Sequence, residues 1–158
     1  MPRITTFITY VDQAEDAAKF YCSVFKSSRI VATTHYGDNM PGKKGSAMTV
    51  ELELDGTRFV FLNGGDHFKL TDAASLMVDC KTQDEIDYYA TKLSAGGGKE
   101  VACGWVTDKF GLSWQIVPAQ LSELISDSDP KRSQRVMEAV MQMNRLDIAT
   151  MQTAYAGT

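Results

Sequence analysis

The sequence is short of the residues that most often build reactive sites. It has two histidines and three cysteines among its 158 residues. Cys22, Cys80 and Cys103 are odd in number and widely separated, so they form neither a disulfide framework nor a Cys-x-x-Cys metal motif. We therefore expect free thiols and a reducing, cytoplasmic location.

Long hydrophobic runs and clustered positive charge are also missing. No apolar stretch reaches the roughly 20 residues that cross a bilayer, and the first residues lack the order of a signal peptide. The formal net charge is -4, and the only basic runs are Lys43-Lys44 and Lys131-Arg132. Phosphate contact needs a clustered basic face. We therefore expect neither a membrane nor a nucleic acid as a partner.

The first half of the chain predicts a strand, a helix and three more strands. Residues 4–11 are rich in β-formers, and Asp12 with Glu15 three residues later predicts a capped helix start. Asp55-Gly56 predicts a two-residue hairpin turn. The three later strands are predicted at residues 29–35, 47–54 and 58–62.

The second half repeats this plan. Residues 75–80 predict a strand, and Thr82 with Glu85 repeats the capping pattern. Gly96-Gly97-Gly98 is typical of a helix end. The first copy alone contains the glycine-containing loop of residues 36–46. The later strands of the second copy are predicted at residues 100–102, 104–107 and 112–117.

The end of the chain has a different pattern. Pro130 follows Asp129, which is typical of a helix start. Residues at alternating steps of four and three then predict one amphipathic, Met-rich helix that packs on this subunit or on a dimer mate: Met137, Met141, Asn144, Ile148, Met151 and Tyr155. We therefore predict an α+β fold of two tandem βαβββ modules, residues 1–65 and 66–120, with a helical tail over residues 121–158, all in one compact unit.

Three stretches carry a family resemblance. Residues 59–68 read Phe-Val-Phe-Leu-Asn-Gly-Gly-Asp-His-Phe, residues 75–80 read Ser-Leu-Met-Val-Asp-Cys, and residues 103–118 read Cys-Gly-Trp-Val-Thr-Asp-Lys-Phe-Gly-Leu-Ser-Trp-Gln-Ile-Val-Pro. Over nearly its whole length the chain resembles the PhnB-like, "3-demethylubiquinone-9 3-methyltransferase-like" branch of the vicinal oxygen chelate (glyoxalase/bleomycin-resistance/dioxygenase) superfamily. The resemblance implies the glyoxalase/bleomycin-resistance-like fold, a pocket between paired half-sheets, and a homodimer.

The resemblance also implies where a metal would bind. Superfamily enzymes hold a divalent ion with residues from the first and last strands of each module, and these positions correspond here to Phe7, Val60, Ser75 and Gln115. Only Gln115 is a competent ligand, whereas a divalent ion needs three or four oxygen, nitrogen or sulfur donors. We therefore predict no metal and no cofactor.

The methyltransferase label is not supported by the residues. The common adenosylmethionine-dependent fold uses a Gly-rich loop between a parallel strand and a helix. The glycine cluster of residues 96–98 instead follows a helix, where a role in ending that helix explains it.

Candidate site residues follow from the predicted strands and turns. His67, in a glycine-containing turn, is a candidate general base or anion-orienting group, with a backbone-bonded loop histidine as the alternative. Cys103 and Asp108 are further catalytic candidates, although a buried, inert Cys103 is favoured. His35 is interpreted as an ordinary strand-end residue. The predicted small-molecule pocket contains a few polar groups among aromatic ones: Phe7, Phe61, Asn63, His67, Phe68, Trp105 and Gln115.

Three functions stay open at this point. The leading one is a metal-independent protein that binds a small molecule of unidentified structure. The second is a metal-independent enzyme that uses His67 with Asp108 or Cys103. The third is a metal-dependent glyoxalase- or dioxygenase-type enzyme. The sequence also leaves open whether the modules pair within a chain or across chains.

Overall fold

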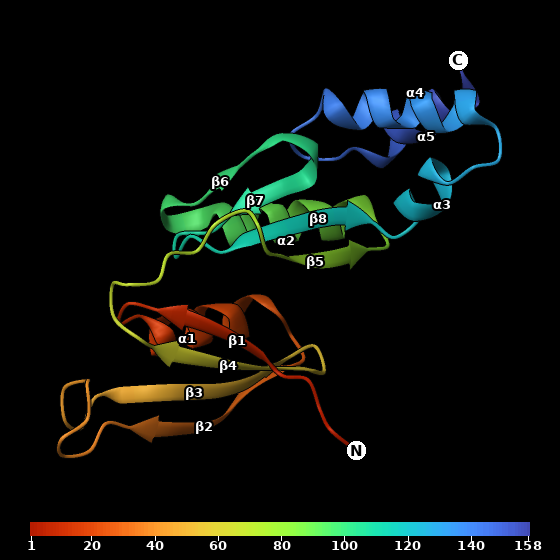
Figure 1. Ribbon diagram of the computed structural model, residues 1–158. Coiled ribbons are helices and arrows are strands. Elements are labelled where there is room, and N and C mark those ends of the chain that lie inside the picture. The colour runs from red at the N-terminus through yellow and green to blue at the C-terminus, as the bar shows by residue number, and fades with distance from the viewer. The chain divides into compact units, whose positions relative to one another are not determined.

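The computed structural model describes residues 1–158, the whole of the chain. The chain divides into two compact units, a first unit of Met1–Leu70 and a second unit of Thr71–Thr158. Each unit contains one four-stranded sheet (Figure 1). None of the helices has the length and apolar character needed to span a membrane.

The first unit is a βαβββ module. Its elements are β1 (Thr6–Tyr10), α1 (Ala14–Val24), β2 (Ser28–His35), β3 (Ala47–Leu54) and β4 (Thr57–Asn63). The strands lie in the spatial order β1-β4-β3-β2, with β1 and β4 parallel and the other neighbours antiparallel. Asp55 and Gly56 have positive φ angles of 46° and 80°, so the hairpin turn predicted between β3 and β4 is confirmed.

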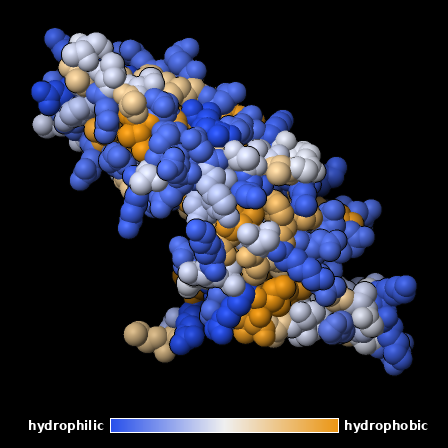
Figure 2. Space-filling model, turned by 180° about the vertical axis from the view of Figure 1, so that it is seen from behind, coloured by the Kyte–Doolittle hydropathy of each residue, from blue (hydrophilic) through white to orange (hydrophobic).

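Helix α1 closes one face of this sheet. Tyr21 from α1 and Phe61 from β4 are both buried, with ring centroids 5.7 Å apart. Because side chains alternate along a strand, Phe7 and Val60 point to the opposite face. The side chain of Phe7 is 60% exposed there, and Figure 2 shows hydrophobic residues reaching the surface of this unit among hydrophilic ones. The face opposite α1 is therefore only partly covered, since Val60 is buried there and Phe7 is exposed.

The start of α1 differs from the prediction. The helix begins at Ala14, and no side chain caps it locally. Instead the backbone N–H of Ala14 donates to Asn63 Oδ1 at 2.8 Å. The capping box predicted from Asp12 and Glu15 is therefore wrong, because an amide from β4 takes the place of the local carboxylate.

The second unit repeats the module. Its elements are β5 (Ser75–Cys80), α2 (Gln83–Ser94), η1 (Ala95–Gly97), β6 (Lys99–Glu100), η2 (Ala102–Gly104), β7 (Trp105–Thr107) and β8 (Ser113–Pro118). The strands lie in the order β5-β8-β7-β6, with β5 and β8 parallel. Thr82 Oγ1 accepts the backbone N–H of Glu85 at 3.2 Å, so the predicted cap of α2 is confirmed. Trp114 and Ile116 are buried, as alternation along β8 predicts.

The tail contains three helices in place of one long amphipathic helix. These are α3 (Leu121–Ile125), α4 (Pro130–Met141) and α5 (Ile148–Ala156). Between α4 and α5 the carbonyls of Met143 and Asn144 accept the backbone N–H groups of Cys103 and Gly104 at 2.8 and 2.7 Å. The tail is therefore bent by hydrogen bonds to the η2 turn, which a helical repeat in the sequence cannot reveal.

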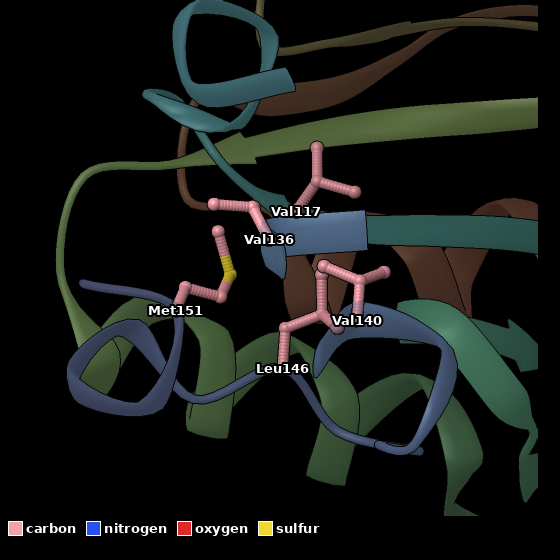
Figure 3. Packing of buried hydrophobic residues seen from close by; sticks show 5 residues of the cluster. All are labelled: Val117, Val136, Val140, Leu146 and Met151. Carbon is pink, nitrogen blue, oxygen red and sulfur yellow. The ribbon is translucent and has the colours of Figure 1, made fainter. Parts of the chain in front are cut away.

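The bent tail shares a core with the end of β8. Figure 3 shows the side chains of this tail cluster converging from β8, from α4 and α5, and from the segment between those helices. Each member is at most 5% exposed: Val117, Val136, Val140, Leu146 and Met151. The predicted α+β fold of two βαβββ modules followed by an amphipathic helical tail is confirmed in its architecture.

Candidate functional site

The first unit contains a pocket at one edge of its sheet. Strands β1, β4 and β2 end at this edge, where β3 begins (Figure 1). The pocket has a volume of about 630 Å³. Its lining residues come from three segments, 11–15, 35–47 and 63–67, although some members of these segments, such as Lys44, do not line it. Small-molecule sites commonly have volumes of roughly 300–1,000 Å³.

One wall of the pocket is the loop between β2 and β3, which is fixed by Tyr36. The Tyr36 hydroxyl donates a short hydrogen bond to the carbonyl of Asn63. The backbone N–H of Gly45 donates to the carbonyl of Tyr36 at 2.8 Å. Gly42 lies against the Tyr36 ring so closely that a Cβ at this position would be 2.2 Å from a ring atom. These contacts hold the wall in place without a ligand.

Asn63 joins three elements at the base of the pocket. Its Oδ1 accepts the backbone N–H of Ala14 at 2.8 Å, and its Nδ2 donates to the carbonyl of Ala47 at 3.0 Å. The residue thereby connects the end of β4 to the starts of α1 and β3. Asn63 was predicted to line a pocket, and the structure places it in this one with a positioning role.

Both histidines of the chain line this pocket. His35 ends β2, and His67 lies in the segment that leaves β4. Both residues are exposed, and neither imidazole has a hydrogen-bond or ion-pair partner. The imidazoles can therefore bind a ligand or exchange a proton with it. The sequence singled out His67 but not His35, because their proximity depends on the order of the strands in the sheet.

The positions at which the superfamily resemblance places metal ligands do not suit a metal. In the first unit Phe7 and Val60 lie directly opposite each other on β1 and β4, and both side chains are hydrocarbon. In the second unit Gln115 Nε2 donates to Ser75 Oγ at 2.9 Å, so these two neutral groups satisfy each other. No group of three or more His, Cys, Asp or Glu side chains in the structure is placed to hold a metal ion.

Asp108, a catalytic candidate, is buried and holds the turn between β7 and β8. Its Oδ1 accepts the backbone N–H groups of Phe110 and Leu112 at 2.9 and 3.1 Å. Its Oδ2 accepts the indole N–H of Trp114 at 2.8 Å. These bonds give the carboxylate a structural role. A catalytic role stays a prediction, and these contacts do not support it.

Cys103, the other candidate of the second unit, is half-buried against the tail cluster. Its φ angle of 63° lies in the left-handed region, and its backbone N–H is held by Met143. A nucleophilic role stays a prediction. Cys80 is fully buried, and this burial raises the pKa of its thiol to about 12, with smaller contributions from Glu85 and Asp79. Its thiolate is therefore scarce at neutral pH.

The remaining aromatic candidates are distributed over different surroundings. Phe61 lies in the core beneath α1 and does not line the pocket. Phe68 is 60% exposed, near Gly64 at the rim of the first unit. Trp105 and Gln115 are paired across β7 and β8 in the second unit. Of the predicted pocket residues, the structure brings Asn63 and His67 together around one pocket, and a single pocket formed by the whole set stays a prediction.

A family model and a solved structure both relate this chain to the same family. A family model described as 3-demethylubiquinone-9 3-methyltransferase matches residues 2–117. A Bacillus cereus structure with the same description, also called PhnB protein, is 35% identical, with a TM-score of 0.67. That match covers 75% of this chain and 100% of the other. The resemblance found in the sequence is thereby confirmed, and the family match ends before the tail.

More distant structures share the fold alone. The fosfomycin resistance protein FosX from Mesorhizobium loti is 13% identical, with a TM-score of 0.57, over 80% of this chain and 98% of that one. FosX from Listeria monocytogenes, whose structure is described as a complex with Mn(II), is 11% identical, also with a TM-score of 0.57, over 78% of this chain and 97% of that one. No curated protein matches the sequence.

Proposed function

The chain belongs to the family described as 3-demethylubiquinone-9 3-methyltransferase, the PhnB-like branch of the vicinal oxygen chelate superfamily, and on this premise we propose that it binds a small molecule without a metal. The observation that carries the proposal is the pocket of the first unit, which both histidines line with unpartnered imidazoles. Its volume suits a small organic ligand, and the carboxylates, the lysine and the imidazoles that line it have no hydrogen-bond or ion-pair partner in the protein.

Binding without a metal follows from the residues at the superfamily's ligand positions. Phe7 and Val60 offer no donor atoms, and a divalent ion held by one amide and one hydroxyl would lack most of its coordination shell. The ligand is therefore held by hydrogen bonds, charge and apolar contact. We expect the purified protein to contain well below one divalent ion per chain.

Methyl transfer is not part of the proposal, although the family name contains it. The loops from β1 to α1 and from β5 to α2 contain no glycine, whereas a doubly wound cofactor fold needs a Gly-rich turn at that place. Each sheet also has only one parallel pair of strands.

A second candidate function is metal-independent catalysis in the same pocket. The observation that favours it is the pair of exposed imidazoles of His35 and His67, because imidazole is the side chain that most often serves as a general acid or base. The two candidates differ in whether the bound compound changes.

The proposal is tested by incubating the full-length protein with a small-molecule extract of cells, washing it, and identifying released compounds by mass spectrometry. We expect one enriched compound, recovered unchanged, and its loss when His35→Ala and His67→Ala are combined. Lys44→Ala is the control, because Lys44 pairs with Asp38 at 2.8 Å and does not line the pocket. Conversion of the compound supports the enzyme instead, and equal capture by the double variant contradicts a site in this pocket.

We also propose that the protein forms a homodimer. The family resemblance supports this, together with an apolar strip on α4 where Met137 and Met141 are 40% and 62% exposed. Flexible methionine side chains adapt readily to a partner surface.

A further inference from the structure

The charged side chains around the pocket are separated by sign. Asp12 and Glu15 follow β1, at one side of the sheet edge. His35 and Lys43 follow the end of β2, at the other side. Because the strand order is β1-β4-β3-β2, the end of β4 and the start of β3 lie between these two groups. Negative charge therefore lines one end of the pocket, and basic groups line the other.

The two ends do not neutralise each other. Neighbouring strands lie about 4.8 Å apart, so β1 and β2, three spacings apart, are separated by roughly 14 Å. No ion pair joins Asp12 or Glu15 to Lys43, whereas the adjacent Lys44 pairs with Asp38. The charges that line the pocket are therefore left available to a ligand.

We propose that this pocket binds a zwitterionic ligand of about dipeptide size, with its ammonium group toward Asp12 and Glu15 and its carboxylate toward His35 and Lys43. This inference rests on the proposed small-molecule function and names the class of its ligand. A ligand with only negative charge meets two carboxylates, and one with only positive charge meets the basic end. A ligand carrying both charges matches both ends, because each opposite charge lowers the electrostatic energy at its own side.

A third group that lines the pocket suits the same ligand. His67 lies in the segment that follows β4, and its imidazole can donate to or accept from the amide in the middle of a dipeptide. The side-chain amide of Asn63 bonds to the starts of α1 and β3, so Asn63 positions the parts of the pocket that these two elements form.

The test uses the imidazole NMR signals of the full-length protein, since only two histidines are present. A His35→Asn variant assigns them. Three probes of matched size are titrated: alanyl-alanine, N-acetyl-alanyl-alanine without the ammonium group, and alanyl-alanine amide without the carboxylate. We expect saturable shifts of both histidines, with alanyl-alanine binding about two- to fivefold more tightly than either blocked probe, because exposed charge pairs contribute modestly.

Matched variants examine each end separately. Glu15→Gln should lower the affinity for alanyl-alanine and leave the affinity for N-acetyl-alanyl-alanine unchanged. Lys43→Ala should lower the affinity for alanyl-alanine and leave the affinity for alanyl-alanine amide unchanged. Their neighbours Asp16 and Lys44 do not line the pocket, so Asp16→Asn and Lys44→Ala should change nothing.

Two results overturn the zwitterion inference: equal affinity for a blocked probe, or no shift with any of the three. Equal affinity for a blocked probe still leaves a small-molecule pocket in place. The extract experiment tests the proposed function independently. Capture of a compound that lacks either charge would support small-molecule binding and contradict the zwitterionic ligand class.

Discussion

Asn63 shows how much of the pocket depends on a single side chain. Its amide is half-buried and bonded to both Ala14 and Ala47. Replacing it by alanine leaves a helix N–H and a strand carbonyl without these partners. We expect Asn63→Ala to lower the free energy of unfolding by about 1–3 kcal/mol, measured by urea denaturation. An unchanged midpoint would contradict its positioning role.

The same residue marks the limit of local sequence reasoning. The cap of α2 could be predicted because its two residues, Thr82 and Glu85, are only three positions apart. Thr82 Oγ1 accepts the backbone N–H of Glu85, and the Glu85 carboxylate accepts the backbone N–H of Lys81. The start of α1 could not, since Asn63 lies 49 residues from Ala14. His35 was interpreted as an ordinary strand-end residue for the same reason: it lines the same pocket as His67 only when β2, β3 and β4 assemble.

At the scale of elements, α5 depends on the cap provided by Asp147. Its Oδ1 accepts the backbone N–H of Thr150 at 2.7 Å, and hydrogen bonds from the side chain and backbone of Thr150 lower the pKa of Asp147. A carboxyl whose folded pKa is lowered stabilises the fold above its unfolded pKa, and this stabilisation is lost as pH falls through the folded value.

Two variants separate the cap from the charge. Asp147→Ala should cost about 1 kcal/mol at pH 7, because the helix loses its cap. Asp147→Asn should keep the cap, so its free energy of unfolding should stay close to that of the parent protein at pH 7. It should lose less stability than the parent protein does when the pH falls below about 4. Urea denaturation at both pH values measures this. If the parent protein and the Asn variant lost the same stability at low pH, the Asp147 carboxylate would not contribute to the acid sensitivity of the fold.

The tail is an integral part of the second unit. Leu146 is fully buried between α4 and α5, within the tail cluster, whereas Gln152 on α5 is exposed. We expect Leu146→Ala to cost about 2–5 kcal/mol and Gln152→Ala less than about 0.5 kcal/mol, by urea denaturation. Equal, small effects would indicate a loosely attached tail.

The break within this tail could not be predicted from its repeat. Spacing at four and three residues describes which side chains share a helix face, and it continues unchanged across residues 142–147. What bends the chain is the pair of carbonyls that accept from Cys103 and Gly104. Two short helices packed on the unit are thereby favoured over one long exposed helix.

At the scale of the whole molecule, the duplicated plan was the most predictable feature. Strand alternation, one helix cap and one hairpin turn are local patterns, and each recurs in the structure within a few residues of its expected place. The pocket was less predictable, because it is formed by loops and strand ends whose meeting depends on sheet order.

Assembly provides a further prediction at this scale. We expect light scattering to give a molar mass twice the 17.4 kDa of the chain. Changing Met137 and Met141 together to lysine should shift the mass toward the monomer, because charges in an apolar contact are costly. A monomeric parent protein would contradict the proposal. A dimer unaffected by the variant would place the contact elsewhere.

The central claim, that the chain binds a small molecule in the pocket of the first unit without a metal, has one most direct measurement. Native mass spectrometry compares EDTA-treated protein with the combined His35→Ala and His67→Ala variant after exposure to a cell extract. The account predicts one added small-molecule mass per chain on the chelated parent protein and none on the variant. Binding that appears only after a divalent ion is restored, or that persists in the variant, would contradict it.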